Sequence, residues 1–338
     1  MKDRILKSQD IISVIISAYN SESTIEKTLC SLETQDLDKN LYEVIIMDDG
    51  STTPRIREIV EYFIGKKSMN LYYFFQKNEW VWRARNAWIS KSVGKILAFT
   101  DADCICDTDW LSTIWRNLIE EKRQFIGWYT YSDDTVIFPW KMAPVHQTGI
   151  TANMAVDFTL LDWQVFDSGF TGMMGDDTDF VLRMEINDYL LKYTPDMRVL
   201  HPPNILSLKR ILIRARGSHN LVWLYKKHGE KVLSSFSPIF RPIIFKRISF
   251  FTVIIFIIIV ILLTLLSIFW LLYFFIAISL FPVIFFLYLY KFLVVYNPDS
   301  RDISMMDRWK TLYYLFFITP LFFYYRIVGM IKFRFFML

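Results

Sequence analysis

Short apolar runs rich in β-branched residues alternate with segments of helical periodicity through the first hundred residues. The runs occupy residues 11–17, 42–47, 70–75 and 95–100, and the helical segments occupy residues 25–32, 54–64 and 83–92. Continuous apolar runs of this length are typical of strands buried on both faces, and their alternation with helices favours right-handed crossovers. The sequence therefore predicts an α/β domain with a Rossmann-like, mostly parallel sheet. Asn20, Ser21 and Ser23 are candidate N-caps for the first helix.

Polar side chains follow three of these apolar runs at the point where each run ends. Tyr19-Asn20 follows the first run, Asp48-Asp49 follows the second, and Asp101-Ala102-Asp103 follows the fourth. In parallel sheets of this kind, ligands bind beyond the carboxyl ends of the strands. We therefore expect residues far apart in the sequence to meet at one edge of the sheet and to form a binding site there.

The spacing of Asp101 and Asp103 suits a metal ion. One small residue between the two aspartates lets both carboxylates reach one ligand sphere in an extended or turning segment. A hard divalent ion binds one or two carboxylates and completes its coordination with water and substrate phosphates. A solvated turn is the alternative for such a pair. The position at a strand end, level with Asp48 and Asp49, favours the metal site.

The last third of the chain is far more apolar than the rest. Residues 249–296 are almost entirely apolar and carry no charge before Lys291. A single helix of that length would measure about 70 Å against a hydrocarbon core of about 30 Å, so we predict two membrane crossings. Residues 311–330 are apolar again but contain Pro320 and Arg326. A third span, a re-entrant helix and an interfacial helix all remain open for them, and we favour a span.

These patterns divide the chain into three parts. We predict an α/β domain at residues 1–234, an interfacial linker at 235–248 and a membrane region with two or three transmembrane helices at 249–338. Basic residues in the linker, such as Lys246 and Arg247, are attracted to anionic lipid headgroups. Residues 1–10 are charged and lack the apolar core of a signal peptide. We therefore expect the first domain in the cytoplasm, at the inner or plasma membrane.

Charge and cysteine content narrow the function further. The net charge is +4, but the α/β domain holds no basic cluster, which argues against nucleic acid as a partner. Three cysteines give no disulfide framework and suit a reducing compartment. Cys104-Ile105-Cys106 could bind a metal, but without a second such pair buried thiols are the favoured interpretation.

Six segments in order carry a resemblance to a known family. They are VIISAYN (residues 14–20), IIMDDGST (45–52), RARNAW (83–88), ILAFTDAD (96–103), GDDTDFVLR (175–183) and PDMRVLH (195–201). Together they resemble family 2 glycosyltransferases, which have the GT-A fold. The resemblance covers residues 11–229 and implies a metal-dependent enzyme that transfers a sugar from a nucleotide-diphosphate sugar, with a UDP-sugar as the favoured donor.

The resemblance also implies roles for individual residues. The nucleotide-sugar residues would be Tyr19, Asn20, Asp48, Asp49, Arg85, Asn86 and Asp101. Asp48 would support the nucleotide loop, and Arg85 and Asn86 would lie on the donor side. Asp101 and Asp103 would hold Mg²⁺ or Mn²⁺ against the diphosphate, with His201 as a third and more distant ligand. A loop histidine beside Pro202 is the alternative for His201.

Asp177 answers to the family's general base in the acidic segment 176–179. It would take the proton from the acceptor hydroxyl as that oxygen attacks the anomeric carbon, which inverts the configuration. The alternative is that the acids open a helix at residues 178–188, where N-terminal carboxylates favour the helix dipole. The two interpretations are compatible if Asp176 and Asp179 cap the helix while Asp177 faces the pocket as the general base. Arg183, four residues after Asp179, could pair with it.

Three other functions fit less well. A nucleotidyltransferase would carry a glycine-rich basic loop after the first strand, and residues 17–24 have neither glycine nor a basic residue. A polymer synthase that exports its product would need more spans. An inactive membrane scaffold or glycan-translocation component would have lost the acids. We expect transfer of single sugars to a lipid-linked or cell-surface glycan acceptor, alongside membrane lipids and other glycan-assembly enzymes.

Overall fold

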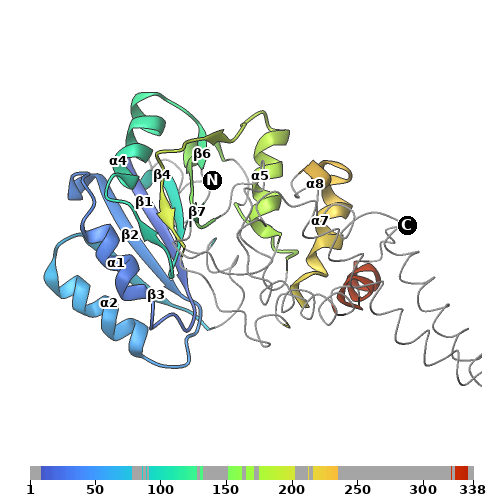
Figure 1. Cartoon of the computed structure of the whole chain (residues 1–338), viewed down its shortest axis with the longest axis horizontal. Coiled ribbons are helices and arrows are strands. Elements are labelled where there is room, and N and C mark those ends of the chain that lie inside the picture. The colour runs from blue at the N-terminus through green and yellow to red at the C-terminus, as the bar shows by residue number, and fades with distance from the viewer. Residues whose placement is uncertain are drawn as a thin grey trace, which may run out of the picture.

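A seven-stranded sheet forms the centre of the computed structural model, which describes residues 9–77, 86, 89, 91–127, 130–131, 151–161, 165–170, 175–201, 212, 216–234, 321 and 324–333. The strand order is β3-β2-β1-β4-β8-β6-β9 (Figure 1). Parallel neighbours make up its first half: β3 (Asn70–Phe75), β2 (Tyr42–Asp48), β1 (Gln9–Ala18) and β4 (Gly94–Asp101). The prediction of an α/β domain with a mostly parallel sheet is confirmed.

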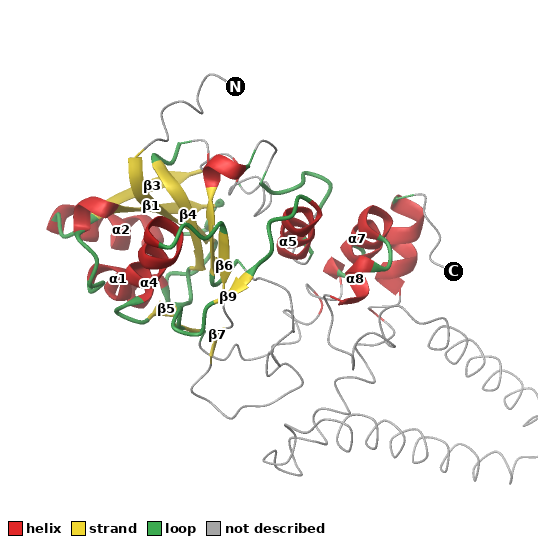
Figure 2. Cartoon of the chain, turned by 90° about the horizontal axis from the view of Figure 1, so that it is seen from above, coloured by secondary structure: helices red, strands yellow, loops and turns green. Residues whose placement is uncertain are grey.

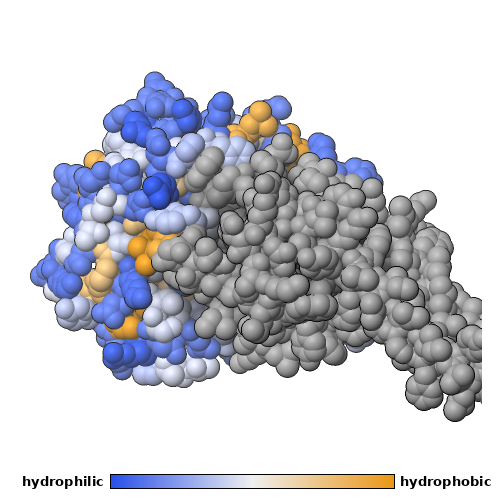
Figure 3. Space-filling view, viewed as in Figure 1, coloured by the Kyte–Doolittle hydropathy of each residue, from blue (hydrophilic) through white to orange (hydrophobic). Residues whose placement is uncertain are grey.

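Successive residues of β1 contact two different layers, because side chains alternate across a strand. Val14 and Ile16 share a core with α1 (Ile25–Glu33), α2 (Arg55–Lys66) and α4 (Trp110–Trp115). Ile15 lies in a second core with α5 (Asp176–Ile186) and α7 (Asn220–His228). Figure 2 shows α5 and α7 across the sheet from α1 and α2. The outer surface around α1, α2 and α4 is mostly hydrophilic (Figure 3).

Shorter strands complete the architecture. In the main sheet, β8 (Met154–Asp157) is antiparallel to both β4 and β6 (Phe125–Gly127), and β9 (Lys192–Tyr193) is parallel to β6. A second sheet has the order β5-β10-β7, with β5 (Ile105–Cys106), β10 (Val199–Leu200) and β7 (Thr130–Tyr131). This small sheet brings residues near position 200 beside the segment that follows β4.

The remaining described elements are short. They are two 3₁₀ turns, η2 (Lys39–Leu41) and η4 (Phe158–Leu160), a π-helical turn η3 (Arg116–Glu120) that continues α4, and α8 (Lys231–Ser234). Of the predicted helix at residues 83–92, the structure describes residues 86, 89, 91 and 92; the first two are helical, and residues 91 and 92 are not.

The predicted N-caps of the first helix are wrong. The capping position belongs to Thr24, whose side chain makes no capping hydrogen bond. The carbonyl of Ser21 instead accepts hydrogen bonds from Thr24 N and Ile25 N, both at 3.0 Å. Asn20 is unavailable for capping because its Oδ1 accepts a hydrogen bond from Thr52 N, at 2.9 Å.

The end of the chain packs against α7. Residues 324–332 are helical, and the ring of Phe333 stacks on Trp223 with centroids 5.1 Å apart. Gly329 approaches His219 so closely that a Cβ atom there would lie 2.7 Å from the carbonyl oxygen of His219. Lys226 Nζ donates to the carbonyl oxygen of Phe333 at 2.9 Å. This part of the predicted membrane region is therefore in contact with the α/β domain.

Among the described residues, no helix has both the length and the apolar composition needed to cross a membrane. The predicted spans within residues 249–296 lie outside the described residues, and so do residues 311–320. The membrane region stays a prediction.

Candidate functional site

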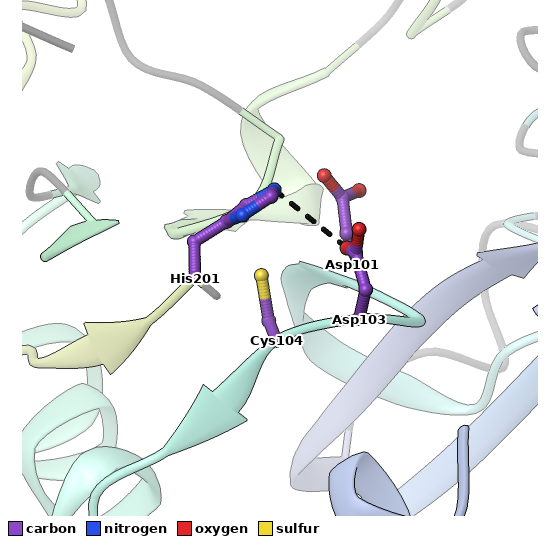
Figure 4. Close-up of side chains that lie close together, drawn as sticks. All are labelled: Asp101, Asp103, Cys104 and His201. Carbon is purple, nitrogen blue, oxygen red and sulfur yellow. Dashed lines mark ion pairs between the residues drawn. The ribbon is translucent and has the colours of Figure 1, made fainter. Parts of the chain in front are cut away.

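Four side chains of the types that bind metals meet beyond the carboxyl end of β4. Asp101 is the last residue of that strand, Asp103 and Cys104 follow it, and His201 comes directly after β10. Each of the four offers a ligand atom, and these atoms all lie within 4.8 Å of one another (Figure 4). His201 Nε2 lies 3.6 Å from Asp103 Oδ1. The aspartate pair and the histidine, 98 residues apart in sequence, are thus brought together as the sequence analysis expected.

Main-chain hydrogen bonds hold this arrangement in place. Cys104 N donates to the carbonyl oxygen of Asp101 at 3.1 Å, which closes the turn between the strand and β5. Leu200 pairs with Ile105 across the small sheet. His201 N then donates to the carbonyl oxygen of Tyr131 at 2.8 Å. Strand pairing therefore sets the position of the imidazole relative to the two carboxylates.

The donor set fits a divalent cation. The side chains of Asp103 and His201 are 31% and 22% exposed, so the cluster is reachable from solvent. Two carboxylates and an imidazole are suitable ligands for an ion that also binds phosphate oxygens. Asp101, Asp103 and His201 are the residues that could hold it.

Cys104 belongs to the same cluster, which the sequence analysis did not anticipate. Its thiol is fully buried. Burial raises the pKa of the Cys104 thiol, and the charges of Asp101 and Asp103 raise it further. Cys106 has no part in the cluster, and its Sγ lies 3.9 Å from Thr100 Oγ1. Both thiols are buried, as the favoured interpretation had it, and the signal that could have found Cys104 in the cluster is its position directly after Asp103.

The loops after β1 and β2 are joined through Asn20. Asn20 has a positive φ of 49°, a conformation that asparagine tolerates better than most residues. Its main-chain N donates to Ser51 Oγ at 2.9 Å, and its Oδ1 accepts from Thr52 N at 2.9 Å. Tyr19, the residue before it, is 49% exposed. The Asn20 side chain thus holds the two loops together beside an accessible tyrosine ring.

Asp48 and Asp49 are buried at the end of β2 and make different contacts. Asp48 accepts hydrogen bonds from Ser51 N and from the hydroxyl of Tyr73, both at 2.8 Å. Burial raises the pKa of Tyr73, and this hydrogen bond to Asp48 raises it further. Asp49 Oδ1 accepts from Gln76 Nε2 at 2.7 Å. Tyr73 and Gln76 are supporting residues that the sequence analysis missed. Both lie on or directly after β3, a neighbour of β2.

Asn86 bonds to the main chain of a distant loop. Its Nδ2 donates to the carbonyl oxygen of Phe166 at 2.7 Å, and Phe166 N donates to Asn86 Oδ1 at 3.0 Å. The structure therefore places this predicted donor-side residue where it fixes the segment before α5. Arg85 lies outside the described residues.

The helix that carries Asp177 begins earlier than predicted. α5 runs from Asp176 to Ile186 rather than from 178 to 188, and its N-cap is Gly175 with a positive φ of 96°. A glycine suits this position because the left-handed conformation is strained for other residues. Asp177 lies in the first turn, and its Oδ1 accepts from Thr178 N at 2.7 Å.

The expectation that Asp179 caps this helix is wrong. Asp179 is fully buried and contacts two cationic side chains and a histidine: Arg183 Nε at 2.7 Å, Lys227 Nζ at 2.5 Å and His228 Nε2 at 2.8 Å. Burial acts to raise the pKa of Asp179, but the hydrogen bond from His228 and the charges of Arg183 and Lys227 hold it below its ordinary value. The i,i+4 pair with Arg183 was predicted correctly.

The Asp179 cluster extends to a neighbouring loop. Lys227 Nζ also lies 2.5 Å from Asp167 Oδ2, and Asp167 Oδ1 accepts from Gly169 N at 2.7 Å. α7 therefore holds the first turn of α5 and the loop at residues 165–170 together. Lys227 and His228 follow no motif, so no sequence signal pointed to them.

Comparisons with known proteins agree with this geometry. The profile of "Glycosyl transferase family 2" matches residues 13–176. Glycosyltransferase AglE of Haloferax volcanii is 35% identical over 100 residues, which cover 30% of this chain and 33% of that protein. Poly(ribitol-phosphate) beta-N-acetylglucosaminyltransferase TarS of Staphylococcus aureus is 29% identical over 157 residues, which cover 45% of this chain and 25% of that protein. The matches thus span a third or less of either relative.

Solved structures show the same fold. The mannosyltransferase PcManGT of Pyrobaculum calidifontis, solved with GDP-Man and Mn²⁺, is similar with a TM-score of 0.52 at 18% identity, and the match covers 72% of this chain and 73% of that one. Residues 1–349 of S. aureus TarS, solved with UDP-GlcNAc, give a TM-score of 0.50 at 16% identity over 69% of this chain and 86% of that one. At these identities the likeness concerns the fold alone.

Proposed function

Because the chain belongs to glycosyl transferase family 2 through its residues 13–176, we propose that it transfers a sugar from a nucleotide-diphosphate sugar to an acceptor hydroxyl. The observation that carries this proposal is the meeting of Asp101, Asp103 and His201 beyond the end of β4. These residues would hold Mg²⁺ or Mn²⁺ beside the donor. When bound, such an ion neutralises the negative charge that develops on the departing nucleotide diphosphate.

The nucleotide is proposed to bind along the loops that follow β1, β2 and β3. Tyr19 offers an exposed ring for the base, and Asp49 lies at the end of β2, one residue after the buried Asp48. Asn20 and Asp48 would keep the shape of these loops through the hydrogen bonds to Thr52 and Ser51. We favour a UDP-sugar as the donor, which is the donor type bound in the TarS structure. Arg85, which lies outside the described residues, would belong to the donor side of the site.

Asp177 is the proposed general base. Its carboxylate would accept the proton of the acceptor hydroxyl while that oxygen attacks the anomeric carbon, so that a single displacement inverts the configuration. Two features support this role. Asp177 lies at a helix N-terminus, where peptide dipoles stabilise negative charge, and the neighbouring Asp179 is held by Arg183, Lys227 and His228.

The acceptor is proposed to be a lipid-linked or cell-surface glycan, with the α/β domain at the cytoplasmic face of the inner or plasma membrane. The uncharged run that begins at residue 249 supports this location. An enzyme held at the headgroups would meet a lipid-linked acceptor at high effective concentration. The protein should stay with membranes after an alkaline wash. Release into the supernatant would contradict the proposed location but would leave the proposed reaction unaffected.

The reaction is tested with membranes that contain the full-length protein. Release of nucleotide diphosphate and transfer of sugar are measured over UDP-, GDP- and dTDP-sugars, with Mn²⁺ or Mg²⁺ and then with a chelator. We expect one donor to be used, and activity to disappear with the chelator, in Asp103→Ala and in Asp177→Asn. Asp188→Asn, which alters an exposed acid just past the end of α5, is the matched control and should retain activity.

Failure would take a specific form. If no nucleotide sugar is consumed, and if no nucleotide diphosphate binds in the presence of either metal, the transferase proposal is wrong. The inactive membrane scaffold would then be the better description of the chain.

A further inference from the structure

The proposed metal site contains one ligand that differs in kind from the others. Asp101, Asp103 and His201 offer oxygen and nitrogen atoms, whereas Cys104 offers sulfur. In Figure 4 the Cys104 sulfur points into the space between the imidazole and the two carboxylates. Mg²⁺ and Mn²⁺ prefer oxygen ligands and gain little from a thiol. The cysteine is therefore not explained by the ion that the proposed reaction needs.

A thiol, an imidazole and a carboxylate are the ligands that Zn²⁺ prefers, and four of them make a closed tetrahedral site. With bonds of about 2.1 Å, neighbouring ligand atoms of a tetrahedron lie about 3.4 Å apart. His201 Nε2 and Asp103 Oδ1 are 3.6 Å apart, close to such an edge. Since all four ligand atoms lie within 4.8 Å of one another, no edge has to shorten by more than about 1.4 Å to reach the tetrahedral spacing.

We propose that this site has a second mode, in which Asp101, Asp103, Cys104 and His201 enclose a zinc ion and shut out the donor diphosphate. A closed four-ligand site leaves no position for a substrate oxygen, in contrast to the open sites of catalytic metals. Sites of this kind bind Zn²⁺ more tightly than Mn²⁺. Zinc would therefore inhibit an enzyme that manganese supports.

The binding step is a simple exchange at sulfur. The S–H bond of Cys104 breaks, an S–Zn bond forms, and the proton passes to water, so that no oxidant or reductant is involved. Cys104 lies directly after Asp103, so ligation needs no movement of a distant segment. The inhibitory half of the proposal rests on the proposed transferase function, whereas the binding half does not.

The binding half is tested with Co²⁺ as a spectroscopic substitute for zinc in the purified full-length protein. We expect a thiolate-to-cobalt charge-transfer band and the strong visible absorption of tetrahedral cobalt, both removed by added Zn²⁺. Both signals should vanish in Cys104→Ser and persist in Cys30→Ser, which alters an exposed thiol on α1. Identical cobalt spectra in wild type and Cys104→Ser would overturn the proposal.

Zinc affinity provides a second measurement that does not depend on activity. Loss of one ligand should weaken Zn²⁺ binding, measured by competition with a chromophoric chelator, by at least about tenfold in Cys104→Ser and not in Cys30→Ser. Equal affinity in the two variants would count against the closed site.

The inhibitory half is tested by titrating Zn²⁺ into the Mn²⁺-supported reaction. The zinc concentration that halves the rate should rise by at least about tenfold in Cys104→Ser relative to Cys30→Ser. An unchanged concentration would overturn the inhibitory mode. If no transfer is found with any donor, the proposed function fails, while the cobalt spectra still decide whether the four residues form a zinc site.

Discussion

The loops after β1 and β2, where we propose that the nucleotide binds (the nucleotide loops), and the first turn of α5 are both built around buried aspartates. They are held in different ways. Asp48 is bound by Ser51 N, three residues away, and by the hydroxyl of Tyr73 on the neighbouring strand. Asp179 is bound by Lys227 and His228 of α7, 48 and 49 residues away. Asp48 is thus stabilised by hydrogen bonds within its loop and from the neighbouring strand, whereas Asp179 is stabilised by ion pairs with Arg183 of its own helix and Lys227 of a distant helix, and by a hydrogen bond with His228.

This difference has an energetic consequence. A hydrogen bond to a loop contributes about 0.5–1.5 kcal/mol, and its loss is partly replaced by water. Removing one partner of a buried ion pair costs about 3–5 kcal/mol, because the remaining charge is left uncompensated. We therefore expect substitutions around α5 to affect the protein more strongly than substitutions in the nucleotide loops.

The largest effect should come from Asp177→Asn. Removal of a general base lowers the rate by about 10²- to 10⁴-fold. The asparagine oxygen can still accept the hydrogen bond from Thr178 N, so the helix should keep its first turn. Initial rates of nucleotide release, measured beside the melting temperature, separate the two effects.

Asp188→Asn is the matched control for this change. Asp188 is exposed and has a positive φ of 65°, a conformation that asparagine also adopts. Its rate and melting temperature should match those of the wild type. If Asp177→Asn retained more than about a tenth of the wild-type rate, the role of general base would have to be given up.

Asp179→Asn should come next, and its effect should be on stability. Arg183, Lys227 and His228 would lose their common counter-charge, at a cost of about 3–5 kcal/mol. Thermal or denaturant unfolding of the full-length protein measures this loss. Again Asp188→Asn is the control. A variant as stable as the control would show that the cluster does not hold α5 in place.

The same cluster predicts a pH dependence. Because the folded protein holds the pKa of Asp179 below its ordinary value, the unfolded chain binds the proton more readily. The contribution of Asp179 to stability is therefore complete above the ordinary carboxyl pKa, and it is lost as the pH falls through the lowered value. Wild type and Asp179→Asn should differ most at neutral pH and converge in acid. A constant difference across this range would contradict the assignment.

The sequence predicted the nucleotide side of the molecule well for a physical reason. The carboxyl ends of parallel strands meet at one edge, so the strand assignments alone brought residues 19–20, 48–49 and 101–103 together. His201 was placed correctly only through its resemblance to a family motif. Its actual position depends on pairing between two-residue strands, β10 with β5 and β7, which no periodicity reveals.

The α5 side was predicted less well because its contacts are non-local. The acids at residues 176–179 suggested capping, since carboxylates near a helix start favour the dipole. Tertiary structure overrode this preference for Asp179, because α7 places Lys227 and His228 beside it. Buried thiols were the favoured interpretation of Cys104 and Cys106, and both are buried. The place of Cys104 beside the aspartates was not predicted, because it depends on the turn after β4 and on His201, which comes from the distant strand β10.

Asn86→Ala sharpens the comparison because Asn86 links the two sides. Asn86→Ala removes both hydrogen bonds to the main chain of Phe166, at a cost of about 1–3 kcal/mol. The melting temperature should fall. The melting temperature of Asn70→Ala should fall less, because that variant loses hydrogen bonds made at an exposed position. If Asn86→Ala instead raised the KM for the donor at an unchanged melting temperature, Asn86 would act mainly through the substrate.

Ser51→Ala should give the smallest effect. The hydroxyl of Ser51 accepts one hydrogen bond from Asn20 N, and its loss should cost about 0.5–1.5 kcal/mol. Two other bonds keep the loops in place: Thr52 N donates to Asn20 Oδ1, and Asp49 N donates to the carbonyl oxygen of Ala18. Ser51→Thr keeps the hydroxyl and serves as the control in the same unfolding measurement. If Ser51→Ala lowered the free energy of unfolding as much as Asp179→Asn does, the nucleotide loops would depend on one side chain as strongly as α5 depends on its buried charge. The contrast between the two sides would then disappear.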